Sequence, residues 1–505
     1  MALEELRERL GRIHDLSRAA GLLAWDERTM MPSAGAEARA EQLATLARVR
    51  HEMFTDEEIG ALLERARTDL GDEIERHGES IDADLVRVTS RDWEKARRVP
   101  AELRAEIART TAISEHVWVE AKAESDFGRL LPHLEQNVEL ARRYAACYDG
   151  FPGFSHPYDP LLDEFEPEMT TEEMRRVLGE LREGLVPIVK GATENGAPPE
   201  DVFQGEFPAN AQRELVRGLI SELPFPEGSW RLDPTEHPFA ISIGRGDVRL
   251  TTRYDESNLG LALFSALHES GHGLYESGVD PELARTPLAK PRSLGLHESQ
   301  SRLWENWVAR SRPYLEWALP RLRERFPDRF DGIDAAALES AANRVERSLI
   351  RIEADEVTYN LHILIRFELE LDLLEGQIAV ADLPAAWNAR YRDYLGLEVP
   401  DDARGVLQDV HWAAGSFGYF PTYSLGNVIA GQLWVAASAD LPDLDDGIAA
   451  GDLGPLGDWL REKVHRHGRR LSPAEILEGA GCGELSVKPL LDHLRARASI
   501  GSGGG

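Results

Sequence analysis

The stretch His268-Glu269-Ser270-Gly271-His272 is the most informative part of this 505-residue sequence. Two histidines four positions apart on a helix lie on one face, one turn apart, so that two imidazole nitrogens can meet a single metal ion. Glu269 is displaced around the same helix, where it can reach the open side of that ion without ligating it. The stretch therefore predicts a metal-binding helix with a carboxylate beside the ion.

The surrounding residues predict that this stretch is helical. Asn258, with Ser257, can cap the start of a helix and Gly278 can end it. Apolar residues recur between these signals at helical spacing, at Leu259, Leu263 and Leu267. A five-residue pattern also arises by chance in a chain with 15 histidines, so a helix with two exposed or core-packed histidines is the plain alternative.

A catalytic zinc site needs a third protein ligand and an open position. His297-Glu298-Ser299-Gln300 opens a second helical stretch, and Glu298 comes 26 residues after His272. That distance along the chain allows a loop and a returning helix. His297 competes for the role, but neighbouring residues point different ways from a helix, so only one of the two can ligate. We favour Glu298.

Hydrolysis of an amide requires further hydrogen-bond donors for the oxyanion, besides a base for the water. The stretch 405–423 combines His411 with Tyr419, Tyr423, glycines and other aromatic residues, which is typical of a loop that lines a site. The alternatives are a buried histidine beside Trp412 and tyrosines that only pack.

A long helix is predicted from about Ala335 to about Leu374. Polar residues follow one side of it, at Arg351, Asp355, Thr358 and His362. Such a stripe is either a solvated or ion-paired face, or the wall of a groove. In a groove, the Arg351 guanidinium could hold the terminal carboxylate of a peptide through two parallel hydrogen bonds.

The fold class is mainly α. Helical spacing recurs along most of the chain, including 38–50, 101–123 and 130–148, whereas 149–157, 193–209 and 223–236 read as loops. Alternating residues at 239–243 and 247–254 predict a small hairpin or three-stranded sheet just before the HExxH helix. No repeat or linker divides the chain, so we expect a single domain over 1–500 and a flexible tail at 501–505.

Charge and cysteine content exclude several classes of function. Acidic residues outnumber basic ones by 89 to 57, which gives a net charge of −32 and disfavours binding to nucleic acid or to an anionic membrane. The two cysteines, Cys147 and Cys482, form no disulfide framework. The sequence shows neither a secretory signal nor an apolar stretch of membrane-spanning length. We therefore expect a cytoplasmic protein with no nucleic-acid or membrane partner.

Five short motifs together resemble a known family, the thermostable metallocarboxypeptidases typified by the Taq carboxypeptidase. They occur in the family's order, and other matches extend the resemblance from about residue 20 to about residue 430. The motifs are His237-Pro238-Phe239, Asp247-x-Arg249-x-Thr251, His268-Glu269-x-x-His272, His297-Glu298-Ser299-Gln300 and Gly405-x-x-Gln408-Asp409-x-His411-Trp412.

The resemblance implies a helical peptidase fold with two lobes flanking a deep central groove, a small sheet beside the HExxH helix, and a homodimer. It implies Zn2+ as the cofactor, with Co2+ as a possible substitute. By position it also implies roles for individual residues: metal ligands His268, His272 and Glu298, catalytic base Glu269, carboxylate-binding Arg351, and transition-state donors His411 and Tyr423, with Tyr419 as the alternative to Tyr423. The first two motifs are expected to frame the edge of the sheet.

Three functions follow from these observations. The first is a zinc-dependent carboxypeptidase of broad specificity, which removes single residues from peptides with a free C-terminus. The second is an endo-acting oligopeptidase of related helical fold, which would have no need of Arg351 as an anchor. The third is a non-catalytic helical scaffold with a vestigial metal site, which is disfavoured because ligands, base and donors are all present.

Overall fold

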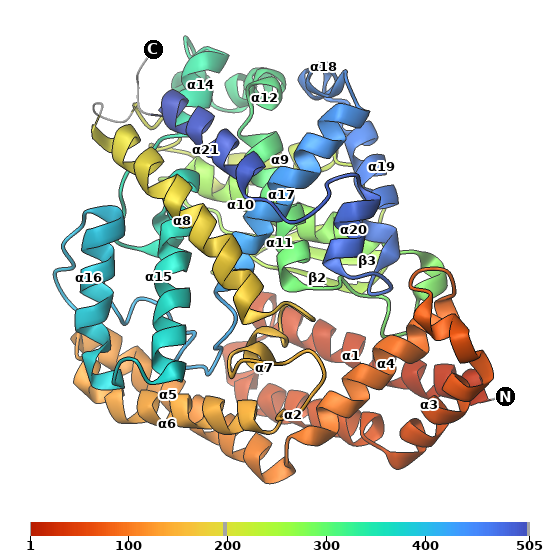
Figure 1. Cartoon of the computed structure of the whole chain (residues 1–505). Helices are drawn as coiled ribbons and strands as arrows, with labels where there is room; N and C mark the ends of the chain where they lie inside the picture. The colour runs from red at the N-terminus through yellow and green to blue at the C-terminus, as the bar shows by residue number, and fades with distance from the viewer. Residues whose placement is uncertain (1, 195–198, 502–505) are drawn as a thin grey trace.

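Helix α10 (Leu259–Gly278) carries the HExxH stretch and has the bounds that its sequence signals predict. The Asn258 side chain caps it by accepting a hydrogen bond from the Leu261 N–H at 3.2 Å. Most of its side chains are buried, because α10 lies at the centre of the molecule with the sheet on one side and other helices around it (Figure 1). The metal-binding stretch is therefore part of the core.

The computed structural model describes residues 2–194 and 199–501. Its N-terminal part is a set of helices that forms the lower half of the molecule in Figure 1. The helices predicted at 38–50, 101–123 and 130–148 are confirmed within this set. Its members are α1 (Ala2–Thr29), α2 (Ala36–Phe54), α3 (Glu57–Leu70), α4 (Ile81–Arg98), α5 (Ala101–Glu124) and α6 (Phe127–Ala146).

The middle of the chain contributes three helices and the sheet. The helices are α7 (Asp159–Leu162), α8 (Thr171–Glu194) and α9 (Ala209–Ile220), and the strands are β1 (Trp230–Pro234), β2 (Ala240–Gly244) and β3 (Asp247–Thr252). Their order is β1-β3-β2, with β2 antiparallel and β1 parallel to β3. The predicted small sheet is confirmed. The loop predicted at 223–236 is wrong in part, because β1 lies within it and forms through pairing with β3 rather than through a local signal.

The sheet packs directly on α10. A Cβ on Gly273 would lie 2.8 Å from Val248 Cγ1 and 2.9 Å from Leu250 Cδ2, so a glycine lets the helix approach the strand. Thr251 Oγ1 accepts a hydrogen bond from the Phe239 N–H at 2.7 Å and lies 2.8 Å from the Phe239 carbonyl oxygen. The His-Pro-Phe motif, just before β2, is thus joined to the Asp-x-Arg-x-Thr motif, which lies on the central strand β3 rather than on an edge strand.

Helices from the C-terminal part surround the other sides of α10. Helix α11 packs against α10, and α17 packs most closely against α11. Buried side chains from α5 through α21 form one apolar cluster. The helices of this part are α11 (Leu294–Arg302), α12 (Arg312–Arg325), α13 (Pro327–Phe330), α14 (Ala335–Ala342), α15 (Glu356–Glu375), α16 (Leu383–Leu395), α17 (Pro421–Asp440), α18 (Leu444–Ala450), α19 (Gly454–Lys463), α20 (Pro473–Gly479) and α21 (Lys488–Gly501).

The long helix predicted from Ala335 to Leu374 is wrong. Two helices, α14 and α15, are separated by an irregular segment in which Arg351 begins a short 3-10 turn, η5 (Arg351–Glu353). The Arg351 N–H donates to Gln408 Oε1 at 3.0 Å, and Asp355 caps the start of α15. These tertiary and capping bonds replace the helical ones, so the polar residues at 351, 355, 358 and 362 do not share one helix face.

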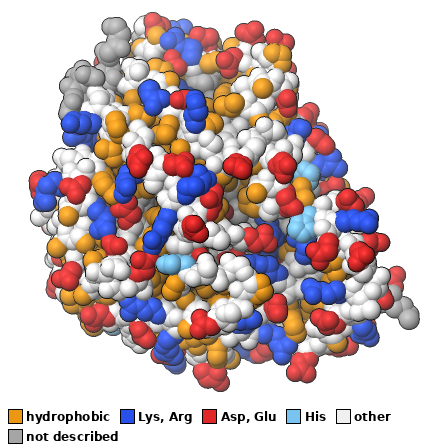
Figure 2. All heavy atoms as spheres, viewed as in Figure 1, with side chains coloured by type: hydrophobic (Ala, Val, Ile, Leu, Met, Phe, Trp, Pro, Cys, Tyr) orange, Lys and Arg blue, Asp and Glu red, His pale blue; other side chains and the backbone are white. Residues whose placement is uncertain are grey.

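The surface is charged and mixed. Figure 2 shows acidic and basic side chains interspersed over the face drawn. None of the helices in the described residues is both long and apolar enough to cross a bilayer. Helix α21 ends at Gly501, the first residue of the expected tail, and 502–505 lie outside the described residues.

Candidate metal centre

Three side chains from two helices converge on one point. His268 and His272 of α10 and Glu298 of α11 offer ligand atoms that all lie within 4.8 Å of one another. Glu298 Oε2 is 3.7 Å from His268 Nε2 and 3.5 Å from His272 Nε2. The three side chains are 17%, 13% and 9% exposed, so the group is recessed but open to solvent. We call His268, His272 and Glu298 the metal group.

Neighbouring groups orient all three ligands. His268 Nδ1 lies 2.9 Å from Glu305 Oε2, and His272 Nδ1 donates to the His297 carbonyl oxygen at 3.1 Å. These bonds place the proton on Nδ1 and leave the Nε2 lone pairs facing Glu298. Arg302 Nε donates to Glu298 Oε1 at 2.7 Å, which leaves Oε2 toward the histidines. Two imidazoles and one carboxylate held in this way fit a divalent ion with an open position.

The charges of the site favour an ionised Glu298. Burial raises the pKa of this carboxyl, but Arg302 and the two histidines outweigh burial and hold the pKa well below its usual range. Glu269 is 6% exposed and behaves differently. Burial raises the pKa of Glu269 to about 7, with Glu298 and Glu305 adding to the rise. The two carboxyl groups are therefore suited to different tasks.

Close helix packing brings the ligands together. A Cβ on Gly271 would lie 2.4 Å from the Gln300 carbonyl oxygen and 2.6 Å from Ser301 Cα, so α10 and α11 meet backbone to backbone. A Cβ on Gly426 of α17 would lie 2.6 Å from Glu298 Cγ. Glycine in the fourth position of His-Glu-Ser-Gly-His thus sets the separation between the histidines and Glu298.

His297, the competing ligand candidate, points away from the metal group. Its ring packs against His272 with centroids 4.2 Å apart, and its Nε2 is 3.7 Å from Glu276 Oε1. His297 supports the metal group through its carbonyl oxygen, which accepts a hydrogen bond from His272 Nδ1, and not through its ring.

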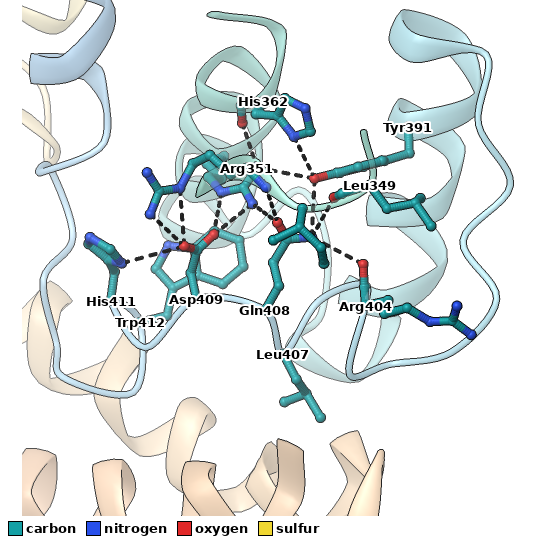
Figure 3. Close-up of polar contacts among 12 residues, drawn as sticks. Leu349, Arg351, His362, Tyr391, Arg404, Leu407, Gln408, Asp409, His411 and Trp412 are labelled. Carbon is teal, nitrogen blue, oxygen red and sulfur yellow. Dashed lines mark hydrogen bonds and ion pairs between the residues drawn. The ribbon is translucent and has the colours of Figure 1, made fainter. Parts of the chain in front are cut away.

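Arg351 is buried and already paired. It is 7% exposed, and its Nε and Nη2 donate to Asp409 Oδ1 at 3.1 and 2.8 Å (Figure 3). Its Nη1 donates to the Tyr359 hydroxyl at 3.2 Å. The Arg302 guanidinium lies 4.7 Å from the Tyr359 ring centroid, and Arg302 binds Glu298. The chain Glu298–Arg302–Tyr359–Arg351 therefore links Arg351 to the metal group.

His411, Tyr419 and Tyr423 gather beside Arg351. The Arg351 guanidinium is 5.3 Å from the Tyr423 ring centroid, and the His411 ring is 5.4 Å from Tyr419 and 6.5 Å from Tyr423. Burial lowers the pKa of His411 to about 4, and Arg351 and Arg366 lower it further against the opposing effect of Asp409. The structure thus brings the predicted anchor and donor residues into one neighbourhood.

Sequence reasoning assigned no role to three supporting residues, Glu305, Arg302 and Asp409, although Asp409 lies in one of the motifs. Glu305 lies in a π-helical turn, η4 (Leu303–Ala309), that follows α11, and π-helical turns are frequent at functional sites. Arg302, four residues after Glu298, could have been found from that helical spacing. The contact of Asp409 with Arg351 carries no local signal, because 58 residues separate them.

A helical fold around an HExxH helix that is completed by a glutamate from the following helix defines a metallopeptidase. A family model described as Carboxypeptidase Taq (M32) metallopeptidase matches residues 5–498. The chain belongs to this family and is a metallocarboxypeptidase, which implies a divalent metal and peptide substrates.

Individual relatives match along nearly the whole chain. Thermostable carboxypeptidase 1 of Thermus thermophilus is 42% identical over 489 residues, 95% of each protein. Carboxypeptidase 1 of Bacillus subtilis is 38% identical over 500 residues, 98% of each. The crystal structure of the M32 carboxypeptidase from Deinococcus radiodurans R1 superposes with a TM-score of 0.93 at 40% identity, over 99% of both chains. These matches confirm the resemblance found in the motifs.

Proposed function

We propose that the chain is a zinc-dependent carboxypeptidase that removes single amino acids from the C-terminus of peptides with broad specificity. The observation that carries the proposal is the position of Arg351, which is joined to the metal group through Tyr359 and Arg302. A buried guanidinium beside a hydrolytic centre suits recognition of a carboxylate, which an endopeptidase does not need.

The metal group and Glu269 divide the work on the attacking water. His268, His272 and Glu298 would hold the ion, Zn2+ with Co2+ as a substitute. A bound ion of this kind lowers the pKa of water toward neutrality and polarises the scissile carbonyl. Glu269 takes the proton of the attacking water and delivers it to the leaving amine nitrogen.

Arg351 has donors to spare for a substrate carboxylate. A guanidinium carries five N–H groups. Asp409 takes Nε–H and one N–H of Nη2, and Tyr359 takes one N–H of Nη1. By this count, within the described part of the chain, one N–H on each terminal nitrogen is left. Those two form the fork that binds a carboxylate through parallel hydrogen bonds.

His411 and Tyr423 are proposed to donate hydrogen bonds to the oxyanion that forms at the scissile carbonyl. Their proximity to Arg351 supports this role, since the scissile carbonyl lies one residue from the terminal carboxylate. Tyr419 is the alternative donor, because its ring is 5.3 Å from that of Tyr423.

The remaining expectations belong to the same proposal. The apolar cluster shared by α5 through α21, and a second cluster that joins α1, α3 and α4 to Val279, Leu283 and Leu288, support one catalytic domain over 1–500. The groove between two lobes rests on the family resemblance. Cys147 and Cys482 are free thiols, which is compatible with a cytoplasmic setting. The homodimer rests on the family resemblance, and sedimentation velocity of the purified protein tests it.

The test compares one peptide with a free C-terminus and the same peptide amidated. Mass spectrometry of the products should show stepwise loss of single residues from the acid and little cleavage of the amide. Equal cleavage of both at internal bonds would instead identify an oligopeptidase. Chelator treatment and Glu269→Gln should each abolish hydrolysis, and added Zn2+ should restore the chelated enzyme alone. Undiminished hydrolysis after both treatments contradicts the assigned metal chemistry.

A further inference from the structure

Two buried arginines share one carboxylate behind the proposed active site. Arg351 holds Asp409 Oδ1, while Arg366 Nε donates to Asp409 Oδ2 at 2.7 Å (Figure 3). Gln408 braces both arginines, because its Oε1 accepts from the Arg351 backbone N–H at 3.0 Å and from Arg366 Nη2 at 2.8 Å. We call Arg351, Arg366 and Asp409 the arginine cluster.

The arginine cluster carries one positive charge too many. Two guanidinium groups face the Asp409 carboxylate, and Gln408 is neutral. Glu370 also interacts with Arg366, but burial raises the pKa of Glu370 to about 7, so near pH 6 this carboxyl is mostly neutral. His362 lies beside Arg366, and burial, with Arg366 and Arg351, holds the pKa of His362 well below its usual range, so it is neutral as well. Arg366 is fully buried and Arg351 nearly so. An unbalanced charge with little access to water is costly, so the cluster is better satisfied when an anion joins it.

His411 is placed to sense that anion. Its Nδ1 is buried and has no hydrogen-bond partner in the described structure, and it lies 4.0 Å from Asp409 Oδ1, the oxygen that Arg351 occupies. The charged groups facing His411 are Asp409, Arg351 and Arg366. The aromatic rings of Tyr419, Phe420 and Tyr423 pack around it. Burial, together with the two guanidinium groups, outweighs Asp409, so His411 is neutral in the free enzyme.

We propose that the terminal carboxylate of the peptide, bound at the free edge of Arg351, cancels the excess charge and allows Asp409 Oδ1 to accept a hydrogen bond from His411 Nδ1. His411 then takes up one proton from solvent and becomes an imidazolium, whose Nε2–H faces away from Asp409 as a stronger donor. The anion that anchors the substrate therefore also activates the donor. Asp409 and Arg366 act through His411 and Arg351 and are positioning residues.

The inference rests on the proposed function and adds a kinetic consequence. An anchor alone would lower KM for peptides with a free C-terminus. Activation of His411 by the carboxylate should also raise kcat, so an amidated peptide stays slow even at saturation. We expect a kcat ratio between acid and amide of at least about tenfold, equivalent to about 1.4 kcal/mol.

The direct test follows the His411 ring by NMR in the Zn2+-loaded enzyme with 13C-labelled histidine. Glu269→Gln prevents turnover, and the additional change His411→Gln identifies the signal. We expect the pKa of His411 to rise by about three units, from about 4 to about 7, when the acid peptide binds, and not when the amidated peptide binds. An equal response to both peptides overturns the inference.

Kinetics of Asp409→Asn supply a second readout. The acid and amide peptides should approach the same kcat in this variant, because His411 loses its acceptor charge. Asp163→Asn is the matched control, since Asp163 is also a buried carboxylate held by two cations, Arg91 and Lys95. It should keep the kcat difference, and loss of the difference in both variants overturns the inference.

A measurement of proton uptake does not need Asp409→Asn, so it tests the inference even if that variant does not fold. Calorimetry of acid-peptide binding to Glu269→Gln in two buffers of different ionisation enthalpy should show uptake of protons near pH 6, with none for the amide. Identical uptake for both peptides overturns the inference. The products that the unmodified enzyme releases distinguish failure of the proposed function from failure of the inference alone. Internal cleavage rejects the proposed function itself, whereas single-residue release without a carboxylate-dependent His411 response rejects only the inference.

Discussion

Gly271 of α10 lies so close to Gln300 of α11 that a Cβ at position 271 would come within 2.4 Å of the Gln300 carbonyl oxygen. Backbone atoms cannot move aside as a flexible side chain can. Gly271→Ala should therefore push the two helices apart and separate Glu298 from the histidines. We expect the free energy of unfolding to fall by about 1–3 kcal/mol and zinc affinity to fall with it. Urea unfolding and competition with a chromophoric chelator measure the two effects.

Gly218→Ala is the matched control for this change. Gly218 is also helical, in α9, but a Cβ there would meet no atom within 4 Å. Alanine is favoured over glycine in a helix by about 1 kcal/mol, so this variant should be as stable as the parent or more so, with unchanged zinc affinity. If Gly271→Ala also keeps its zinc affinity, close packing of the two helices does not set the geometry of the metal group.

Glu305 should matter for the metal although it is not a ligand. It faces His268 Nδ1 at 2.9 Å and so fixes the ring that presents Nε2. Losing such a partner typically lowers metal affinity by about 10–100-fold, and we expect this for Glu305→Ala. Glu305→Gln should lose less, because its amide oxygen can still accept from Nδ1. Chelator competition ranks the variants.

Glu339→Ala controls for the loss of a buried carboxylate as such. Glu339 accepts from Arg312 Nε at 2.8 Å and, in the described part of the chain, makes no hydrogen bond or ion pair with the histidines of the metal group. It should lower stability without changing zinc affinity. Equal affinities for Glu305→Ala and Glu339→Ala would show that the bond to His268 contributes nothing specific.

Local signals explain why the HExxH helix could be predicted from sequence. Asn258 and Gly278 mark its two ends, and the caps act within a few residues of chain. The spacing after this helix makes Glu298 and its neighbour His297 the candidates for the third ligand, and Glu298, the one we favour, is the residue that joins the metal group. Helix caps and short spacings along the chain can be read from a single sequence.

The failed helix at 335–374 shows what local signals omit. Apolar periodicity continues through the break, but the Arg351 N–H is bonded to Gln408, which lies 57 residues further along the chain. Asp355 starts a new helix there. A tertiary contact overrides propensity at this point, and it is also where the proposed anchor lies. The contacts of Glu305 and Asp409 depend on the same kind of long-range arrangement.

Tyr423 and Tyr419 can be separated by paired substitutions. Tyr423 lies against both Arg351 and Tyr359, whereas the Tyr419 ring packs edge-on against Phe165 at 5.0 Å. Tyr423 is therefore closer to the proposed anchor. We expect Tyr423→Phe to lower kcat by about 100-fold, as loss of one oxyanion donor does, with little change in KM. Tyr419→Phe serves as the control and should stay near the parent, and the reverse order would assign the donor to Tyr419.

Asp163 should make the protein sensitive to acid. Arg91 and Lys95, with the Glu168 N–H, outweigh the effect of burial and hold the pKa of Asp163 below its usual range. A carboxyl whose pKa is lower in the folded state stabilises the fold above its unfolded pKa, about 4, and this contribution is lost as the pH falls further. Asp163→Asn removes the buried partner of two poorly exposed cations and leaves Arg91 and Lys95 only the more exposed Glu168 and Glu164, so we expect a loss of about 3 kcal/mol at neutral pH.

The difference in unfolding free energy between the parent and Asp163→Asn should accordingly shrink below about pH 4. At that pH the Asp163 carboxyl of the unfolded parent chain takes up a proton, which stabilises the unfolded state. Urea unfolding at about pH 7 and about pH 3.5 measures that difference. Asp401→Asn is the control, since Asp401 pairs with Arg404 at the exposed surface at 2.6 Å, where an ion pair contributes little at either pH. A gap for Asp163→Asn that stays the same at both pH values would show that ionisation of Asp163 is not what stabilises this part of the fold.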